Sequence, residues 1–305
     1  MKIRFLSPAL FLSLLLALGF TNCSNDDPIE DSEQNTGTTG DSNSGNNSEN
    51  GDQNGNQGED DQNNGSTTDS LKIIFEDDFE GSDSIPDKSK WVLCEKGDDS
   101  WNRYLSESYA QVYQKNGSLF IYGENVGGVY QTGGIETRGK FDFCYGVVEC
   151  KARFVRQPQG NHTGIWMMPS PPAEKWPKSG EIDIMEHLNA DNLIYETVHS
   201  WYIDDMGHKD SPKAQTTVDI NKEDWNVYGV KWTPDSIVYT VNGQNCLSYP
   251  NLHLAGENGD YQWPFDHSFY LILSQSLGGE DTWAGAIDES ELPAIFEIDW
   301  IKVYQ

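Results

Sequence analysis

Three carboxylates stand close together in the run Gly180–His187, which reads Gly-Glu-Ile-Asp-Ile-Met-Glu-His. In an extended strand, side chains two residues apart face the same side, so Glu181 and Asp183 share one face. Glu186 would face away in a regular strand, but one extra residue, a β-bulge in the Ile-Met pair before it, returns it to that face. Three acids on one face push their pKa values apart, and a nucleophile and a general acid working side by side need this separation.

Short strand-like runs separated by turn signals must position this motif, and residues 71–305 show no long 3.6-residue periodicity. An Asn-Gly pair at residues 242–243 predicts a tight hairpin. Many short strands joined by Gly, Pro and Asn turns predict an all-β fold, either a two-sheet sandwich or a jelly roll. Clear examples of the runs are Leu71–Phe75, Ser118–Tyr122, Tyr145–Phe154, Thr197–Tyr202, Ile237–Val241, Phe269–Leu273 and Phe296–Tyr304.

The chain begins as a targeting segment. Two basic residues precede the apolar run Phe11–Phe20, which is too short for a typical membrane span. The next residues, up to Cys23, resemble the cleavage box of bacterial lipoproteins, and the acidic residues after Cys23 resemble a surface-export tag. We therefore expect a signal peptide over 1–22, lipidation of Cys23 and an outer-membrane lipoprotein exposed at the cell surface. Because Asn22 stands where a smaller residue is usual, a secreted or periplasmic protein is the alternative.

Residues 23–70 are almost all small, polar or acidic, without Lys, Arg or aromatic residues, so we expect an anchored, disordered, acidic linker. As a flexible coil it would span roughly 35–40 Å. Residues 71–305 are long enough for one large all-β domain. Of the chain's 49 acidic and 20 basic side chains, 37 and 18 fall there, for a formal charge near −19. Such a charge argues against nucleic acid and favours a neutral ligand over a heavily sulfated polysaccharide.

Cysteine and tryptophan give weaker signals. Cys94, Cys144, Cys150 and Cys246 form no CxxC motif or Cys/His cluster that would indicate zinc, so free buried thiols are expected. All ten tryptophans lie in the domain, and several stand near turns or beside the acids, where their rings suit stacking on apolar sugar faces. Core packing is the alternative for each of these, which are Trp101, Trp166, Trp176, Trp201, Trp263 and Trp283.

Together these segments resemble glycoside hydrolase family 16 over essentially all of 71–305. The blocks that carry the resemblance are Gly134–Lys140, Gly164–Pro169, Trp176–Gly180, Glu181–Glu186, Trp225–Trp232 and Ile298–Tyr304. The resemblance implies a β-jelly-roll sandwich of two antiparallel sheets with a concave, open cleft and endo-acting hydrolysis with retention. It makes Glu181 the nucleophile, Glu186 the general acid/base and Asp183 the residue that holds and tunes Glu181. The bulged spacing belongs to the laminarinase-like and galactanase-like branch.

The resemblance also implies substrate-binding residues. Trp166 and Trp176 match aromatic walls beside the cleaved bond, and His199 matches a cleft-lining position, with a structural histidine as the alternative. Gln275 is expected to face the cleft and to read hydroxyl configuration, while His187 supports the end of the strand. The loop that borders the far subsites is expected to contribute Trp101, Asn102 and Arg103, and Trp283 is one further stacking residue.

Similarity to a subgroup of surface lipoproteins favours β-1,4-galactosyl linkages of mucin-type O-glycans or N-acetyllactosamine chains. A β-1,3- or mixed-linkage glucan is the alternative substrate. No cofactor is expected for catalysis, and the protein is expected to be a monomer. A structural calcium is implied near Asp78, Gly117 and Asp299. The alternative is that these acids are only solvated and bind no ion. The rival from another class is a non-catalytic carbohydrate-binding module, since jelly rolls serve both roles; a calcium-dependent adhesion domain would not explain the tryptophan-flanked acids.

Overall fold

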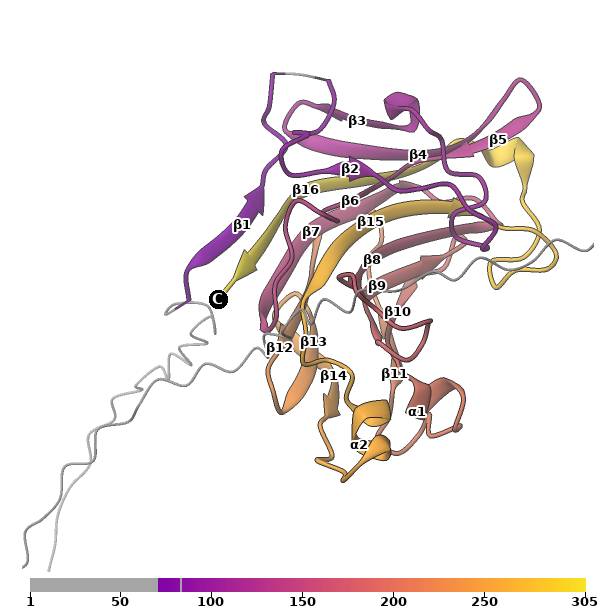
Figure 1. Ribbon diagram of the computed structural model, residues 1–305. Coiled ribbons are helices and arrows are strands. Elements are labelled where there is room, and N and C mark those ends of the chain that lie inside the picture. The colour runs from indigo at the N-terminus through magenta and orange to yellow at the C-terminus, as the bar shows by residue number, and fades with distance from the viewer. Residues whose placement is uncertain (1–70, 83) are drawn as a thin grey trace, which may run out of the picture.

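Two curved antiparallel sheets, stacked face to face, make up the computed structural model, which describes residues 71–82 and 84–305 (Figure 1). The predicted signal peptide, Cys23 and the linker lie outside these residues. Within the described part, no helix is long and apolar enough to cross a membrane. The predicted all-β sandwich is therefore confirmed.

The larger sheet has nine strands in the order β14-β13-β12-β7-β16-β4-β3, with β1 beside β16 and β5 beside β4. Its strands are β1 (Ile73–Asp77), β3 (Val112–Lys115), β4 (Ser118–Val126), β5 (Val129–Thr132), β7 (Gly146–Arg156), β12 (Asn226–Trp232), β13 (Ser236–Val241), β14 (Gln244–Pro250) and β16 (Ala294–Tyr304).

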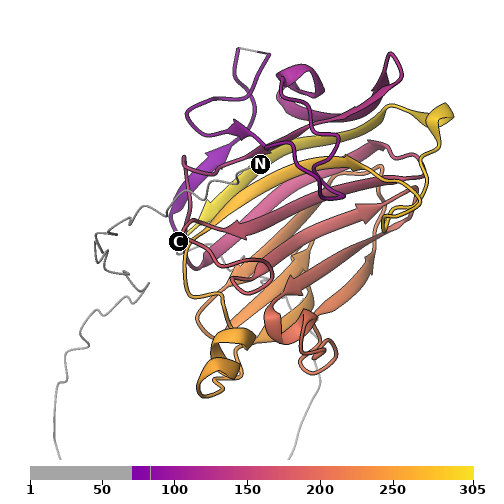
Figure 2. The same ribbon diagram turned by 45° about the vertical axis from the view of Figure 1, so that its right-hand side comes forward.

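The smaller sheet has seven strands in the order β11-β10-β9-β8-β15-β6-β2. They are β2 (Val92–Leu93), β6 (Gly134–Glu136), β8 (Asn161–Pro169), β9 (Glu181–Leu188), β10 (Leu193–His199), β11 (Gln215–Asp219) and β15 (Phe269–Leu277). Two short helices, α1 (Trp201–Asp204) and α2 (Glu257–Gln262), lie together at one end of the sandwich (Figure 2), and the 3-10 turns are Tyr109–Gln111 and Glu289–Glu291.

The core lies between the sheets and is built from the alternating inward positions of their strands. Ile182 and Ile184 of β9 are fully buried in it, next to aromatic side chains of the larger sheet such as Tyr228 and Phe296. Each such side chain contributes about 1.5–3 kcal/mol by leaving water. Because the isoleucines of β9 pack inward, the acids that alternate with them point to the opposite face of the smaller sheet.

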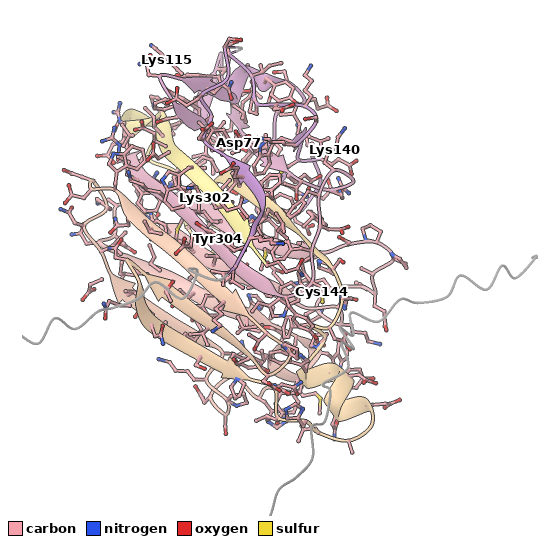
Figure 3. All side chains as sticks on the ribbon, turned by 90° about the vertical axis from the view of Figure 1, so that its left-hand side faces the viewer. Asp77, Lys115, Lys140, Cys144, Lys302 and Tyr304 are labelled. Carbon is pink, nitrogen blue, oxygen red and sulfur yellow. The ribbon has the colours of Figure 1, made fainter. Side chains whose placement is uncertain are left out.

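The first and last described strands pair with each other. Strand β1 lies beside β16, and the backbone groups of Lys72 and Gln305 exchange two hydrogen bonds of 2.9 Å. Figure 3 shows this strand pair from the outside, with Asp77 at the end of β1 and Lys302 and Tyr304 on β16. The carboxylate of Asp77 accepts a 2.7 Å hydrogen bond from the Trp91 indole, which fixes the chain as it leaves β1.

Turn chemistry agrees with the sequence at the hairpin and differs at one strand end. Asn242 and Gly243 both have positive φ, 51° and 77°, as the predicted Asn-Gly hairpin requires. The run predicted as a strand to Tyr202 instead stops at His199. The Ser200 hydroxyl accepts the backbone N–H of Ile203 and begins helix α1, so the end of this run is helical.

Candidate active site

A β-bulge in β9 brings the three acids to one face. Along β8, Ile165 pairs with Met185 but the next residue, Trp166, pairs with Asp183, so β9 carries one extra residue there. The register with β10 shifts at the same place. The predicted bulge is confirmed, and it returns Glu186 to the side of Glu181 and Asp183.

Gly180 fixes where this strand begins. Its φ of +79° is one that residues with a side chain rarely adopt, and a Cβ there would lie 2.5 Å from the ring of Phe265. A glycine is therefore needed directly before Glu181. The chain turns sharply at this point and enters the middle of the sheet, where β8 and β10 flank the acids.

The electrostatics separate Glu181 from Asp183. Burial, then the charges of Glu181 and Glu186, raise the pKa of the Asp183 carboxyl well above its usual range. Burial and the charge of Glu186 also raise the pKa of Glu181, while the His199 charge and hydrogen bonds from Trp176 and Asp183 oppose that rise without cancelling it. The pKa of Asp183 rises further, so within the pair the proton stays on Asp183, which donates it in a hydrogen bond to Glu181.

A histidine and an aspartate support this pair from β10 and α1. His199 Nε2 lies 3.4 Å from Asp183 Oδ2, and its Nδ1 lies 3.1 Å from both oxygens of Asp204. Burial alone would lower the pKa of His199, but the hydrogen bond to Asp204 and the charge of Glu181 outweigh it and raise the pKa. Asp204 reaches this position because helix α1 begins directly after β10.

Glu186 has a different environment. Its Oε1 lies 3.0 Å from His162 Nε2 on β8, and its Oε2 accepts a 3.3 Å hydrogen bond from the Thr197 hydroxyl on β10. Burial raises the pKa of Glu186, but the hydrogen bond and charge of His162, with the His199 charge and Thr197, bring it below the ordinary value. This environment therefore favours the ionised form of Glu186.

Aromatic side chains and hydroxyls line a pocket of about 170 Å³ over these acids. The Trp166 indole donates a 3.1 Å hydrogen bond to Ser274 and lies edge-on to Trp101, with ring centroids 4.9 Å apart. Ser276 lines the same pocket and donates to the backbone oxygen of Trp101. Two of the tryptophans predicted to bind substrate, Trp101 and Trp166, therefore lie at the acids.

Trp176 and Trp283 are the exposed aromatic residues of the site. Trp176 is 49% exposed, its indole N–H donates to Glu181 Oε2, and its ring lies 5.6 Å from that of His199. Trp283 is 52% exposed and lies edge-on to His162 at 5.6 Å. The two rings therefore stand beside different carboxylates, Trp176 at Glu181 and Trp283 at the side of Glu186.

The side chains of Asn102 and Arg103 bind other loop residues of the protein in this structure. The Asn102 side chain is buried and its Oδ1 accepts the backbone N–H of Asp99. Arg103 makes a two-bond ion pair with Asp281, with N–O distances of 3.0 and 3.2 Å. This pair links the loop that carries Trp101 to the loop that carries Trp283.

The prediction that Gln275 faces the cleft is wrong. Its side chain is fully buried and hydrogen-bonded to Thr163 and Asn161, and a Cβ on Gly123 of the other sheet would touch it. Strand alternation explains this, because Ser274 and Ser276 on either side point into the pocket. The cleft-facing polar groups of this strand are therefore the two serine hydroxyls.

The sequence reasoning missed His162, Asp204 and the two serines. His162 precedes Trp166 by four residues on one strand, so the period of two already placed both on one face. Asp204 was missed because the run before it was predicted to be a strand as far as Tyr202, so helix α1, which carries Asp204, was not expected. His187, by contrast, is fully buried, contacts the backbone oxygen of Asp191 and stacks on Phe154, and this confirms its structural role.

The two aspartates predicted for calcium have partners within the protein. The Asp299 carboxylate pairs with Lys151 at 2.8 Å, and Asp78 accepts the backbone N–H of Glu80. Over 71–82 and 84–305, no three His, Cys, Asp or Glu side chains form a group that could hold a metal ion. The predicted set contains only two carboxylates, so this finding does not test it, and calcium binding stays a prediction. The four cysteines from Cys94 to Cys246 are free, and three of them are buried, as expected.

Comparisons with known proteins agree with the geometry. The family model for glycosyl hydrolases family 16 matches residues 98–302. A keratan-sulfate endo-1,4-beta-galactosidase of Sphingobacterium multivorum is 36% identical over 247 residues, which cover 79% of this chain and 56% of that protein. The chain thus spans little more than half the length of that relative.

Two solved structures are similar over the whole domain. One, reported with endo-acting O-glycanases that members of the human gut microbiota express to initiate mucin breakdown, has a TM-score of 0.69 and 32% identity, and the match covers 76% of this chain and 98% of the other. The laminarinase from Rhodothermus marinus has a TM-score of 0.67 and 27% identity, covering 77% and 97%. These likenesses confirm the predicted jelly roll.

Proposed function

The chain belongs to glycosyl hydrolases family 16, and on that premise we propose that it is a retaining endo-β-glycosidase. One observation carries the proposal: the bulge puts two glutamates of one strand on the same face, in the same pocket. Glu181, beside a protonated Asp183, is the nucleophile, and Glu186, between His162 and Thr197, is the acid/base. Retaining enzymes need two carboxyls that lie close together.

The reaction proceeds in two steps. Glu181 attacks the anomeric carbon while Glu186 gives its proton to the departing sugar oxygen, and a glycosyl ester forms on Glu181. Glu186, now ionised, then removes a proton from water, which hydrolyses the ester. As the charge on Glu181 is consumed, the hydrogen bond from the Trp176 indole holds Oε2 of this carboxyl in place.

For the substrate, we propose a β-1,4-galactosyl linkage in mucin-type O-glycans or N-acetyllactosamine chains. The keratan-sulfate galactosidase and the O-glycanase structure, which are at least 32% identical to this chain, support this choice. An endo-β-1,3- or mixed-linkage glucanase is the second candidate, and the likeness to a laminarinase favours it. In either case, a cleft that is open at both ends would let a glycan lie along the sheet and be cleaved at an internal linkage.

Product analysis separates these candidates. Purified protein is incubated with mucin O-glycans, poly-N-acetyllactosamine, galactan, laminarin and mixed-linkage glucan, with E181Q as the matched inactive control. We expect new reducing ends and short oligosaccharides from the galactosyl substrates. Cleavage of laminarin alone would favour the glucanase, and binding of glycans without new reducing ends would support a carbohydrate-binding module instead.

For localisation, we propose a monomeric, surface-exposed outer-membrane lipoprotein. Residues 1–22 would be the signal peptide, Cys23 the acylated residue and residues 23–70 the spacer that holds the domain away from the membrane. Labelling with an alkyne fatty acid in the native host should mark the wild type but not C23A. Protease treatment of intact cells should release the domain, whereas a protected domain would indicate a periplasmic location.

A further inference from the structure

The two oxygens of Glu186 are held by different elements. Oε1 lies 3.0 Å from Nε2 of His162 on β8, while Oε2 is reached by the weaker 3.3 Å hydrogen bond from Thr197 on β10. The residue of β8 that lies directly opposite Glu186 is Gly164, which has no side chain. The imidazole therefore belongs to His162, which lies two residues before Gly164 on β8. It contacts only one oxygen of the carboxyl, Oε1.

The His162 ring is itself held in place. Trp283 lies edge-on to it at 5.6 Å and also packs against Tyr195 at 4.7 Å. The ring is three-quarters buried, since its side chain is 25% exposed. A ring confined in this way presents Nε2 in one direction, toward Oε1 of Glu186.

We propose that His162 is a positioning residue for the acid/base, which donates Nε2–H to Oε1 and so leaves Oε2 to carry the catalytic proton. This inference rests on the proposed function, because it assigns the proton within that same reaction. The Thr197 hydroxyl can accept from a protonated Oε2 as well as donate to an ionised one, so it suits both steps. A hydrogen bond to the ionised carboxylate also favours that form and makes Glu186 a stronger acid.

Other titratable groups lie around Glu186 without a hydrogen bond to it in the described structure. They face it from its own strand, from β10 and, across the core, from β13, and they are Glu181, Asp183, Tyr195, His199 and Tyr239. Strand β15 contributes the hydroxyls of Ser274 and Ser276 to the same pocket. Removing the nitrogen of His162 therefore changes the direct partner of Glu186 and leaves these groups in place.

Two variants of His162 separate its donor from its ring. H162F keeps a flat ring against Trp283 but has no N–H, whereas H162Q loses the ring but can place an amide N–H near the position of Nε2. For H162F we expect kcat/KM on the glycan to fall about 10- to 100-fold, the range for a hydrogen bond to a charged group. The alkaline limb of its pH profile should move up by about half a unit or more. H162Q should keep the wild-type limb and most of the activity.

An activated aryl glycoside of the same sugar supplies the second readout, because its leaving group needs little help from an acid. On that substrate, H162F should lose less than about threefold. Equal losses on glycan and aryl glycoside, or an unmoved alkaline limb, would show that His162 only packs the wall. If H162F does not fold, H162N replaces it, because the shorter amide does not reach Oε1. A wild type that cleaves no glycan overturns the proposed function, whereas a cleaving wild type with unaffected His162 variants overturns this inference alone.

Discussion

At the scale of single residues, the division of labour among the acids follows from their partners. Asp183 is 2% exposed and faces Glu181 and Glu186, so it keeps its proton. Burial also raises the pKa of Glu181, but hydrogen bonds from Trp176 and Asp183 reduce that rise. Glu186 has a histidine and a hydroxyl as partners. The strand places the three carboxyls, and their neighbours decide which of them is charged.

Neutralising either glutamate should stop the reaction. E186Q should lower kcat by about 10²- to 10⁴-fold, the usual contribution of a general acid, and E181Q by at least as much, because no nucleophile remains. D183N should cost less than either, because an amide can still donate to Glu181. Kinetics on the glycan substrate, with circular dichroism as the folding control, test this order. A D183N loss larger than that of E181Q would contradict the assignment.

At the scale of elements, the cleft depends on a link between two loops. Arg103 and Asp281 join the loop of Trp101 to that of Trp283 by two hydrogen bonds. An exposed pair of this kind adds little to stability. Its effect should lie in ordering the loops that border the bound glycan.

Breaking this link should raise KM more than it lowers kcat. For R103Q or D281N we expect KM on a long glycan to rise about three- to tenfold, the cost of ordering a loop on binding, with an unchanged melting temperature. The charge-reversed double variant R103D/D281R should recover part of the affinity. An unchanged KM in both single variants would show that the two loops do not meet the substrate.

A second element, β10, carries a buried carboxyl that the reaction does not use. Glu196 is fully buried on the core side of the strand and neither of its oxygens has a hydrogen-bond partner in the described structure. Burial raises its pKa from 4.5 to about 8. The folded protein therefore keeps this proton up to about pH 8, while the unfolded chain releases it above its ordinary pKa.

Unfolding between these two pKa values releases a proton from Glu196, so the free energy of unfolding should fall as pH rises from about 4.5 to 8. E196Q removes this dependence. Relative to the wild type, we expect it to gain about 1–3 kcal/mol at pH 8 and little at pH 5, by urea unfolding. A gain that is the same at both pH values would mean that Glu196 does not hold a proton in the folded state.

Much of the fold and of the candidate site was predictable from residue patterns, and the features that were not have physical reasons. The bulge, the acids and the hairpin follow from local spacing, because strand alternation and turn chemistry act over a few residues. The prediction for Gln275 was wrong because both faces of its strand are buried. In such a strand, the sequence does not show which of the polar side chains point to the cleft. His162 escaped notice because its partner is 24 residues away along the chain and one strand away in the sheet.

At the scale of the whole molecule, the acidic domain should discriminate against charged glycans. A formal charge near −19 over residues 71–305 repels sulfate groups, and salt screens such repulsion. We expect faster cleavage of desulfated than of sulfated keratan chains at low ionic strength, with a gap that narrows as NaCl is added. A preference for the sulfated chain at low salt would point to a local basic subsite that outweighs the net charge.

In the proposed reaction, Glu181 and Glu186 carry out a double displacement on an internal β-galactosyl linkage. Proton NMR during digestion of an N-acetyllactosamine oligosaccharide tests it most directly, because the first product reports its anomeric form before mutarotation. We expect a β-anomeric galactose reducing end to appear first and the α-anomer to follow at the rate of mutarotation. An α-anomer that appears first would contradict the double displacement.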